Sequence, residues 1–275
     1  MTEKDTHIGD WIESKIEIGD SMKDQLYYFN RFDKWEEAEK YCEMGGYSSA
    51  FILEKVAKAN KEVLLGNALY EQDGIAYTKE HNNYELLFAF FYIYSLEKCL
   101  KVCDFGGALG STYQRYKRIL PCDTEWSVVE QPNYVSYGKK NIDEIDFYYS
   151  LLECIQNKDI NVVLFSGSLQ YLPDPLNVLS EASKVAKYIL IDETSFQKGD
   201  MCDDIYIQHV PSIYYGKEAY YPVRIFDRDR FLDKTSELGL KREFEWLYDG
   251  RGTGIPIVDK GQLKETVDRG FLLIK

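Results

Sequence analysis

The chain has 275 residues, which is enough for one α/β domain with a sizeable core and an attached segment. Its 46 acidic residues outnumber its 33 Lys and Arg residues, and the formal charge of −13 would repel phosphate backbones, which argues against nucleic acid as a partner. The longest apolar stretch is too short for a membrane-spanning helix, which needs about 20 residues, and the opening residues lack the basic and apolar regions of a secretion signal, so we expect a cytoplasmic protein.

The first third of the chain predicts helices. Apolar residues recur at helical spacings, or form a continuous run, in three stretches: residues 33–46, 50–65 and 84–96. Between the last two, residues 70–74 predict a turn in which Glu71 could face a cleft, although a solvated turn is the favoured interpretation. We therefore expect residues 1–97 to form an N-terminal helical cap segment.

From residue 100 onward, short β-branched runs alternate with helical stretches, a pattern typical of βαβ units and a parallel sheet. The candidate strands are residues 100–104, 126–130, 162–166 and 188–192. Two later strands, residues 241–248 and 270–275, predict a hairpin at the edge of the sheet. We therefore expect residues 98–275 to form one α/β domain that carries the cofactor site.

The segment from Glu193 to Pro222 interrupts this alternation. It is rich in Tyr and Pro and too irregular for a predicted strand or long helix. Loops of this length inside a domain are usually functional or disordered, and the aromatic content favours a substrate lid. Within it, Tyr214 and Tyr221 are candidates for stacking on a substrate, or for packing against the N-terminal helices.

A glycine-rich loop follows the first candidate strand and reads DFGGALG from Asp104 to Gly110. A strand, a tight turn and a helix in this order let backbone N–H groups approach a ligand. The dinucleotide pattern would need glycine at Phe105, and the phosphate-loop pattern would need a Lys after the last glycine, so neither fits. The spacing instead indicates a carboxylate, Asp104, near a ligand ammonium, with Phe105, Gly106, Gly107 and Gly110 forming a loop that an uncharged sugar can approach.

Glu130 lies 20 residues after Gly110 and ends the second candidate strand. A carboxylate at this place can accept both hydroxyls of an adenosine ribose, and Gln131 beside it is a further candidate for cofactor contact. The loop and the carboxylate together indicate a nucleoside-containing cofactor. The alternative that stays open is that Asp104 caps the following helix and Glu130 is a solvated strand end.

The third candidate strand breaks at Ser166 and Gly167. Because the carboxyl ends of parallel strands meet at one edge of a sheet, residues 166–170 should face the same cleft as the glycine loop. We expect Ser166 and Gly167 to contact the cofactor and Gln170 to contact the substrate. The alternative for Gln170 is a solvated position at a helix start.

These residues resemble a group of Rossmann-like (class I) methyltransferases that use S-adenosylmethionine (SAM) and are often found in bacterial surface-polysaccharide gene clusters. The matching strings are WEEA (35–38), GGY (45–47), YEQDG (70–74), DFGGALGSTY (104–113), WSVVEQPNYV (126–135), SGSLQYLPDP (166–175), IDETSF (191–196) and QHVPSIY (208–214). The resemblance implies a seven-stranded, mostly parallel sheet with an antiparallel last strand. It also implies SAM as cofactor, held by Asp104, the loop glycines and Glu130. Ala108 departs from the pattern, since such loops often have glycine there.

Methyl transfer to a hydroxyl needs a base that removes its proton. His209, in the expected lid, is the preferred candidate, and Asp192, at the end of its strand, is the second. Either residue could instead be structural, His209 as an ordinary loop histidine and Asp192 as a cap of the next turn. The six cysteines are scattered and accompanied by no histidine cluster, so no metal is expected.

The sequence therefore predicts a SAM-dependent methyltransferase that O-methylates a small polar acceptor, a sugar or sugar nucleotide of surface-polysaccharide synthesis. One alternative is an NAD-dependent nucleotide-sugar oxidoreductase or epimerase. A second is a non-catalytic SAM-binding partner of another enzyme. The sequence leaves the oligomeric state open.

Overall fold

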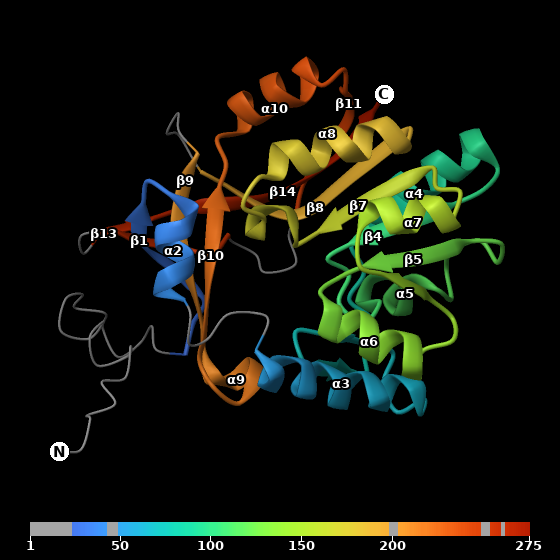
Figure 1. Ribbon diagram of the computed structural model, residues 1–275, viewed down its shortest axis with the longest axis horizontal. Helices are drawn as coiled ribbons and strands as arrows, with labels where there is room; N and C mark the ends of the chain where they lie inside the picture. Colours follow the sequence, from blue (N-terminus) through green and yellow to red (C-terminus); the bar gives the residue numbers. More distant parts are fainter. Residues whose placement is uncertain (1–23, 43–48, 198–202, 249–253, 260–261) are drawn as a thin grey trace.

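The computed structural model describes residues 24–42, 49–197, 203–248, 254–259 and 262–275. Its centre is a seven-stranded sheet in the order β11-β14-β8-β7-β4-β5-β6 (Figure 1). The strands are β4 (Lys101–Phe105), β5 (Glu125–Val129), β6 (Asp146–Tyr148), β7 (Val162–Ser166), β8 (Tyr188–Gln197), β11 (Lys241–Leu247) and β14 (Thr266–Ile274). From β6 to β8 all neighbours are parallel, whereas β14 is antiparallel to both β8 and β11. The expected Rossmann-like sheet with an antiparallel last strand and an edge hairpin is confirmed.

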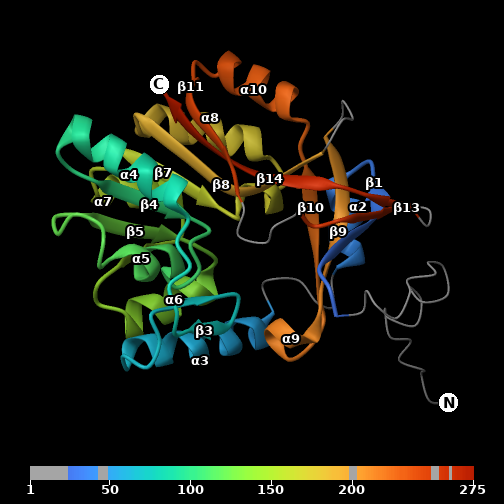
Figure 2. The same ribbon diagram turned by 180° about the vertical axis from the view of Figure 1, so that it is seen from behind.

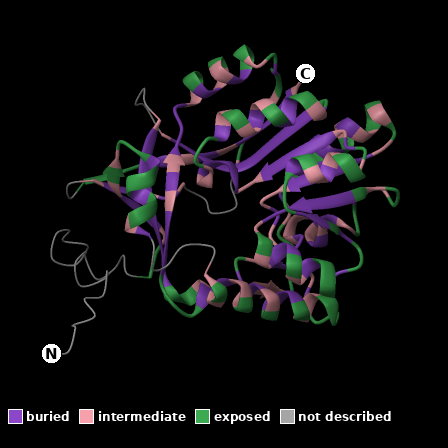
Figure 3. Ribbon diagram, viewed as in Figure 1, coloured by how far each residue is buried: buried purple, intermediate pink, exposed green. Residues whose placement is uncertain are grey.

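Helices cover both faces of this sheet, which explains why its parallel strands are continuous apolar runs. One face packs on α4 (Tyr84–Glu97), α5 (Ser111–Tyr116) and α6 (Pro132–Asn141). The other packs on α7 (Leu151–Asn157), α8 (Pro175–Val185) and α10 (Arg228–Glu237). Figure 1 shows α7 and α8 in front of the sheet, Figure 2 shows α4 on the opposite face, and Figure 3 shows the buried strands between them. Of the described helices, none has the length and apolar character needed to cross a membrane.

A second, five-stranded sheet in the order β10-β9-β1-β12-β13 lies beside the ends of β8 and β14 (Figure 1). Its strands are β1 (Tyr27–Phe32), β9 (Asp204–Val210), β10 (Ala219–Ile225), β12 (Ile257–Asp259) and β13 (Gln262–Lys264). The interpretation of residues 193–222 as irregular was therefore wrong: most of the segment is strand. Every residue of β9 is buried, so the strand shows no polar–apolar alternation, and its partner β1 comes from the far end of the sequence.

The first third of the chain is not wholly helical. The helices α2 (Trp35–Tyr41), α3 (Ala50–Leu64) and α4 are present, but β1 precedes them and a hairpin of β2 (Tyr70–Gln72) and β3 (Ile75–Tyr77) separates α3 from α4. The hairpin packs against both α3 and α5. The end of the first predicted helix, residues 43–46, lies outside the described residues.

The order of the strands in the large sheet fixes the place of a ligand site. The chain runs outward from β4 through β5 to β6 and then returns to β7 on the other side of β4. The connections after β4 and β7 therefore leave in opposite directions, and a crevice opens between them at the carboxyl edge of the sheet. This edge faces the second sheet.

Candidate functional site

A cavity of about 750 Å³ opens at this edge and extends to the second sheet. Most of the residues predicted as site residues line it: Phe105, Gly106, Gly107, Glu130, Gln131, Ser166, Gly167, Gln170, Asp192, Tyr214 and Tyr221. Three others, Asp104, Gly110 and His209, do not line it. Side chains from both sheets thus meet in one space.

The glycine loop between β4 and α5 is shaped by close contacts below it. Gly106 has a φ of 76°, and a Cβ there would lie 2.6 Å from the Cβ of Ser168. A Cβ on Gly107 would lie 2.5 Å from Cγ of Asp104. The two glycines therefore let the backbone pass close to Ser168 and Asp104, and the loop without side chains at these positions lines the cavity. The N–H of Gly106 donates to the carbonyl of Val129 at 2.8 Å, which ties the loop to β5.

Asp104 supports this floor from beneath and does not face the cavity. It is fully buried, and among the described residues neither carboxylate oxygen has a hydrogen-bond partner. Burial raises its pKa to about 7. The residue that caps α5 is Gly110, with a φ of 85°, so Asp104 is not the helix cap either.

Glu130 follows the last residue of β5 and lines the cavity on the far side of the loop, as the sequence predicts. Its Oε2 accepts the backbone N–H of Gln131 at 2.5 Å. Burial raises the pKa of Glu130 to about 7. A buried acceptor that still borders the cavity is suited to hydroxyl groups of a ligand.

Asp192 lies at the cavity, but its carboxylate is engaged by the protein. It accepts two contacts from Nδ2 of Asn83, at 3.0 and 2.9 Å, and one from Nε1 of Trp246 at 2.9 Å. Asn83 in turn caps α4 by accepting the N–H of Leu86. Burial, followed by the charge of Glu193, raises the pKa of Asp192 to about 8. These bonds tie α4 to β11 and leave Asp192 poorly suited to serve as a base.

The next residue, Glu193, was not predicted as a site residue. Ile191 pairs with Phe271 and Thr194 pairs with Arg269, so Asp192 and Glu193 together face a single residue of β14, which is a β-bulge. Glu193 has a φ of 49°, which is rare outside glycine.

The bulge directs the Glu193 side chain into the cavity. Nε2 of Gln170 donates to its carbonyl at 3.1 Å, while Nε2 of Gln72 approaches its carboxylate at 3.3 Å. Nη1 of Arg115 lies 3.9 Å from the carboxylate. A register shift of this kind has no signature in the sequence, although the consecutive acids at a strand end could have drawn attention to it.

The hairpin β2–β3 and helix α5 contribute two more groups: Arg115, which was not predicted, and Glu71, for which a place facing the cleft was the less favoured interpretation. Arg115 of α5 is largely buried, and its guanidinium lies 4.4 Å from the ring centre of Tyr70 and contacts Gln72. Glu71 is 1% exposed and accepts the N–H of Gly74 and the hydroxyl of Ser111, both at 2.8 Å. The favoured interpretation of this segment as a solvated turn was therefore wrong, and burial raises the pKa of Glu71 to about 7.

His209 points away from the cavity. In β9 the neighbouring residues Gln208 and Val210 line the cavity, and side chains of a strand alternate between its faces. The His209 ring stacks on Tyr27 with ring centres 4.6 Å apart, and burial lowers its pKa. The structure does not bring His209 to the other site residues, and we assign it no part in a reaction.

The part of the cavity near the second sheet is aromatic and polar. Tyr214 comes from α9 (Ser212–Tyr215), Tyr221 from β10, and Gln170 and Tyr171 from a short 3-10 helix, η2 (Leu169–Tyr171). The Tyr171 hydroxyl donates to Oε1 of Gln208 at 2.5 Å. These side chains form a wall opposite the glycine loop.

The described lining of the cavity is strongly acidic. It holds six carboxyl groups and a single cationic side chain, Arg115. Burial raises the pKa of three of these carboxyl groups, Glu71, Glu130 and Asp192, to about 7 or 8, and the other three are Glu39, Asp73 and Glu193. Within the described ranges, no three His, Cys, Asp or Glu residues are grouped so that they could hold a metal ion. The cavity therefore favours neutral or cationic ligands over polyanions.

Neither a family model nor a curated protein matches the chain. Among solved structures, it is similar to the N-terminal domain of EvdMO1 crystallised in the presence of S-adenosylhomocysteine (SAH) and D-fucose, with 14% identity and a TM-score of 0.45 over 82% of this chain and 99% of that chain. It is also similar to a SAM-dependent methyltransferase from Clostridium acetobutylicum ATCC 824, with 10% identity and a TM-score of 0.45 over 80% and 98% of the two chains. A third is LepI in complex with SAM, with 13% identity and a TM-score of 0.46 over 87% of this chain and 61% of that chain. These likenesses are remote, and the proposals below rest on the sheet and cavity of the chain itself.

Proposed function

We propose that this chain is a SAM-dependent methyltransferase that acts on a small polar acceptor. The observation that carries the proposal is the juxtaposition of the glycine loop after β4, Glu130 after β5 and the Ser166–Gly167 turn after β7 around one cavity. The loop lacks the Lys of a phosphate loop and the glycine spacing of a dinucleotide site. A nucleoside without phosphates fits this combination.

The residues present suit SAM group by group. The backbone of Gly106 and Gly107 offers a surface without side chains, and Glu130 can accept the ribose hydroxyls. When bound, SAM would supply a methyl group activated by the adjacent sulfonium. The chain itself has to hold the acceptor in line with that methyl group and exclude water, for which a cavity lined by side chains from two sheets is suited.

We place the acceptor against Gln170, Gln208, Tyr171, Tyr214 and Tyr221. Aromatic faces combined with amide and hydroxyl groups suit a sugar, which presents both C–H and O–H surface. The acidic lining disfavours the diphosphate of a sugar nucleotide, so we favour a sugar that carries no phosphate. We propose O-methylation of such a sugar, for a surface polysaccharide, as the reaction.

We assign the removal of the acceptor's proton to Glu193 in place of Asp192 and His209. Asp192 is held by Asn83 and Trp246, and His209 faces the other side of β9. Among the described residues, the Glu193 carboxylate has a long contact with Gln72, at 3.3 Å, and an ion pair with Arg115 at 3.9 Å. It is therefore the carboxylate at this end of the cavity that can most readily take a new partner.

The cofactor assignment is tested by titrating the full chain with SAH in a calorimeter. Glu130→Ala should weaken SAH binding by about 10- to 100-fold, because a carboxylate that accepts two hydroxyls is lost. Glu125→Ala, at the exposed start of the same strand, is the matched control and should bind as the wild type does. Equal SAH affinity in Glu130→Ala would show that the cofactor site is misplaced, and binding of NAD in place of SAH would favour an oxidoreductase.

The acceptor class is tested with methyl-labelled SAM and two panels, free hexoses and the corresponding UDP-hexoses. We expect label to appear in the free sugars. Label confined to the UDP-sugars would contradict the charge argument, and SAM binding without transfer to any acceptor would favour a non-catalytic SAM-binding protein.

A further inference from the structure

Arg115 is the only cationic side chain in the described lining of the cavity, and its hydrogen-bonding capacity is not fully used. A guanidinium has five N–H donors. One nitrogen contacts the Gln72 side chain, and the guanidinium also interacts with the side chains of Tyr70 and Tyr116. Its Nε is buried and has no hydrogen-bond partner among the described residues. An incompletely satisfied buried cation in a cavity indicates a place for an anionic ligand group.

The neighbour that balances the charge of Arg115 is not bound to it closely. Nη1 of Arg115 and Oε1 of Glu193 are 3.9 Å apart, beyond the length of a hydrogen bond, although both side chains are about nine-tenths buried. Glu193 is directed there by a bulge with a left-handed backbone, and the guanidinium lies over the ring of Tyr70. The fold thus places Arg115 and Glu193 near each other, while each charged group can still form hydrogen bonds with another partner.

The anionic group that the proposed cofactor brings is the carboxylate of its amino-acid end. A carboxylate can form two parallel hydrogen bonds with a guanidinium, which a charge at 3.9 Å does not supply. Arg115 lies on the helix that follows the glycine loop, so it belongs to the part of the cavity assigned to the cofactor.

On the basis of the proposed function, we propose that Arg115 binds the carboxylate of the cofactor's amino-acid end. When Arg115 binds this carboxylate, it gives up its ion pair with Glu193. No covalent step is involved: one ion pair replaces another. The exchange releases the Glu193 carboxylate to the acceptor only after the cofactor is bound. Cofactor binding thereby prepares the acceptor site, which predicts an ordered sequence with the cofactor first.

The test compares two ligands, SAH and 5′-methylthioadenosine, which share the adenosine and the thioether but differ in the amino-acid end. Calorimetry on the full chain should show that Arg115→Gln weakens SAH binding by about 10- to 100-fold, the effect expected from one hydrogen-bonded charge pair. Binding of methylthioadenosine should not change. Glu193→Gln should have the opposite sign and strengthen SAH binding by about threefold or more, because the competing carboxylate is removed.

Two further variants keep the comparison clear. Arg118→Gln removes the same charge from an exposed position in the turn that follows α5 and should alter neither affinity. Arg115→Lys retains the charge, and it should keep part of the SAH affinity and serves as the test if Arg115→Gln fails to fold, as judged by circular dichroism.

Equal losses for SAH and methylthioadenosine in Arg115→Gln, or weaker SAH binding in Glu193→Gln, would overturn the exchange. Failure of the wild type to bind either ligand would instead overturn the proposed function itself. The two failures are therefore distinguishable.

Discussion

Ala108 has a left-handed backbone in the middle of the glycine loop, with a φ of 50°. An L-residue other than glycine loses roughly 1–2 kcal/mol in this region because its Cβ crowds the backbone. Glycine would remove that strain, and its greater freedom in the unfolded chain offsets about 0.5–1 kcal/mol of the gain. The departure from the usual loop pattern thus has a defined conformational cost.

We therefore expect Ala108→Gly to raise the free energy of unfolding by about 0.5–1 kcal/mol, measured by urea denaturation. Ala57→Gly, in the middle of α3 where φ is helical, is the control and should lower it by about 1 kcal/mol. A loss of stability in Ala108→Gly would mean that the methyl group makes contacts worth more than the strain.

At the scale of single residues, the sequence was sufficient to place a residue in the cavity where that residue directly follows a predicted strand. Gly106 and Glu130 come directly after consecutive parallel strands, so the common edge of the sheet brings them together. Arg115 and Glu193 could not be predicted, because the hairpin that flanks Arg115 docks from elsewhere in the chain and the bulge depends on pairing with β14. His209 was misplaced because the strand containing it, β9, was taken for a loop. The alternation of successive side chains between the two faces of a strand was therefore not considered.

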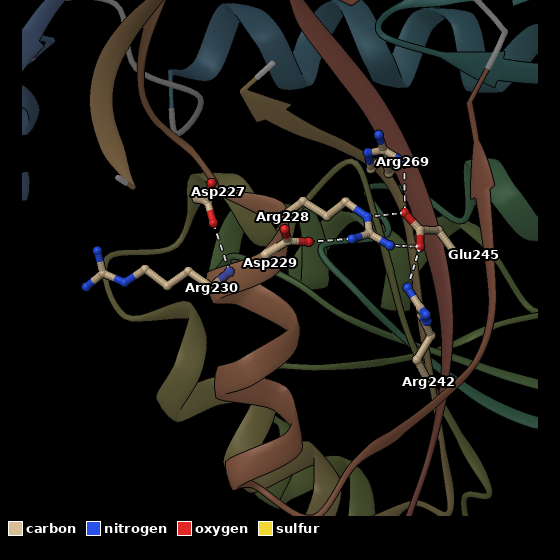
Figure 4. A network of polar contacts seen from close by, with 7 residues as sticks. All are labelled: Asp227, Arg228, Asp229, Arg230, Arg242, Glu245 and Arg269. Carbon is tan, nitrogen blue, oxygen red and sulfur yellow. Dashed lines mark hydrogen bonds and ion pairs between the residues drawn. The ribbon is translucent and has the colours of Figure 1, made fainter. Parts of the chain in front are cut away.

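At the scale of elements, a network around Glu245 joins α10 to the edge hairpin (Figure 4). The Glu245 carboxylate of β11 accepts from Arg228 at the start of α10, at 2.6 Å, and from Arg242 at 2.7 Å and Arg269 of β14 at 2.8 Å. The bonds from Arg228, and then the charges of the arginines, hold the pKa of Glu245 below its ordinary value. Three guanidiniums thus share one partly buried carboxylate, and Arg228 also contacts Asp229.

Replacing Glu245 with Gln leaves these guanidiniums without their common counter-charge, and we expect the free energy of unfolding to fall by about 1–3 kcal/mol. The pKa of Glu245 is lower in the folded protein than in the unfolded chain. The stability that the Glu245 carboxylate contributes is therefore fully present at a pH above its pKa in the unfolded chain, and it is lost as the pH falls through its pKa in the folded protein. Urea denaturation near neutral pH measures the difference. The control is Glu243→Gln, an exposed neighbour that bonds only Tyr92 in the hydrogen bonds described, and it should change stability little. Similar losses in both variants would argue against the network.

The elements that the sequence predicted best are those whose partners lie close along the chain. The parallel strands β4, β5 and β7 are apolar runs, each followed by its own crossover helix, so pattern and topology agree there. The three-residue strand β6 was not predicted, because it is too short to show an apolar run. The second sheet could not be assembled in the same way, because β1 pairs with β9 and β12, which come from near the opposite end of the sequence. Nothing local marks such partners.

At the scale of the whole molecule, four buried carboxyl groups give the fold an unusual dependence on pH. Burial raises the pKa of Glu71, Asp104 and Glu130 to about 7 and, with the charge of Glu193, that of Asp192 to about 8. The ordinary values are 3.8 for Asp and 4.5 for Glu. At a pH between the ordinary and the raised pKa values, the folded chain holds protons that the unfolded chain has released. Lowering the pH within this range therefore raises the free energy of unfolding.

The free energy of unfolding should therefore fall as the pH rises from about 5 to about 8, by up to roughly 1.4 kcal/mol per pH unit for each such group. Above that window these groups are ionised in both states and contribute no further slope. Urea denaturation at a series of pH values measures the trend. Asp192→Asn should reduce the slope by the share of one group, since the amide cannot release a proton and the other three carboxyl groups remain, whereas Asp233→Asn on the exposed side of α10 should leave the slope as it is. Stability that instead rises steadily toward neutral pH would mean that these carboxyl groups are already ionised inside the folded protein, with cationic partners that the described residues do not supply.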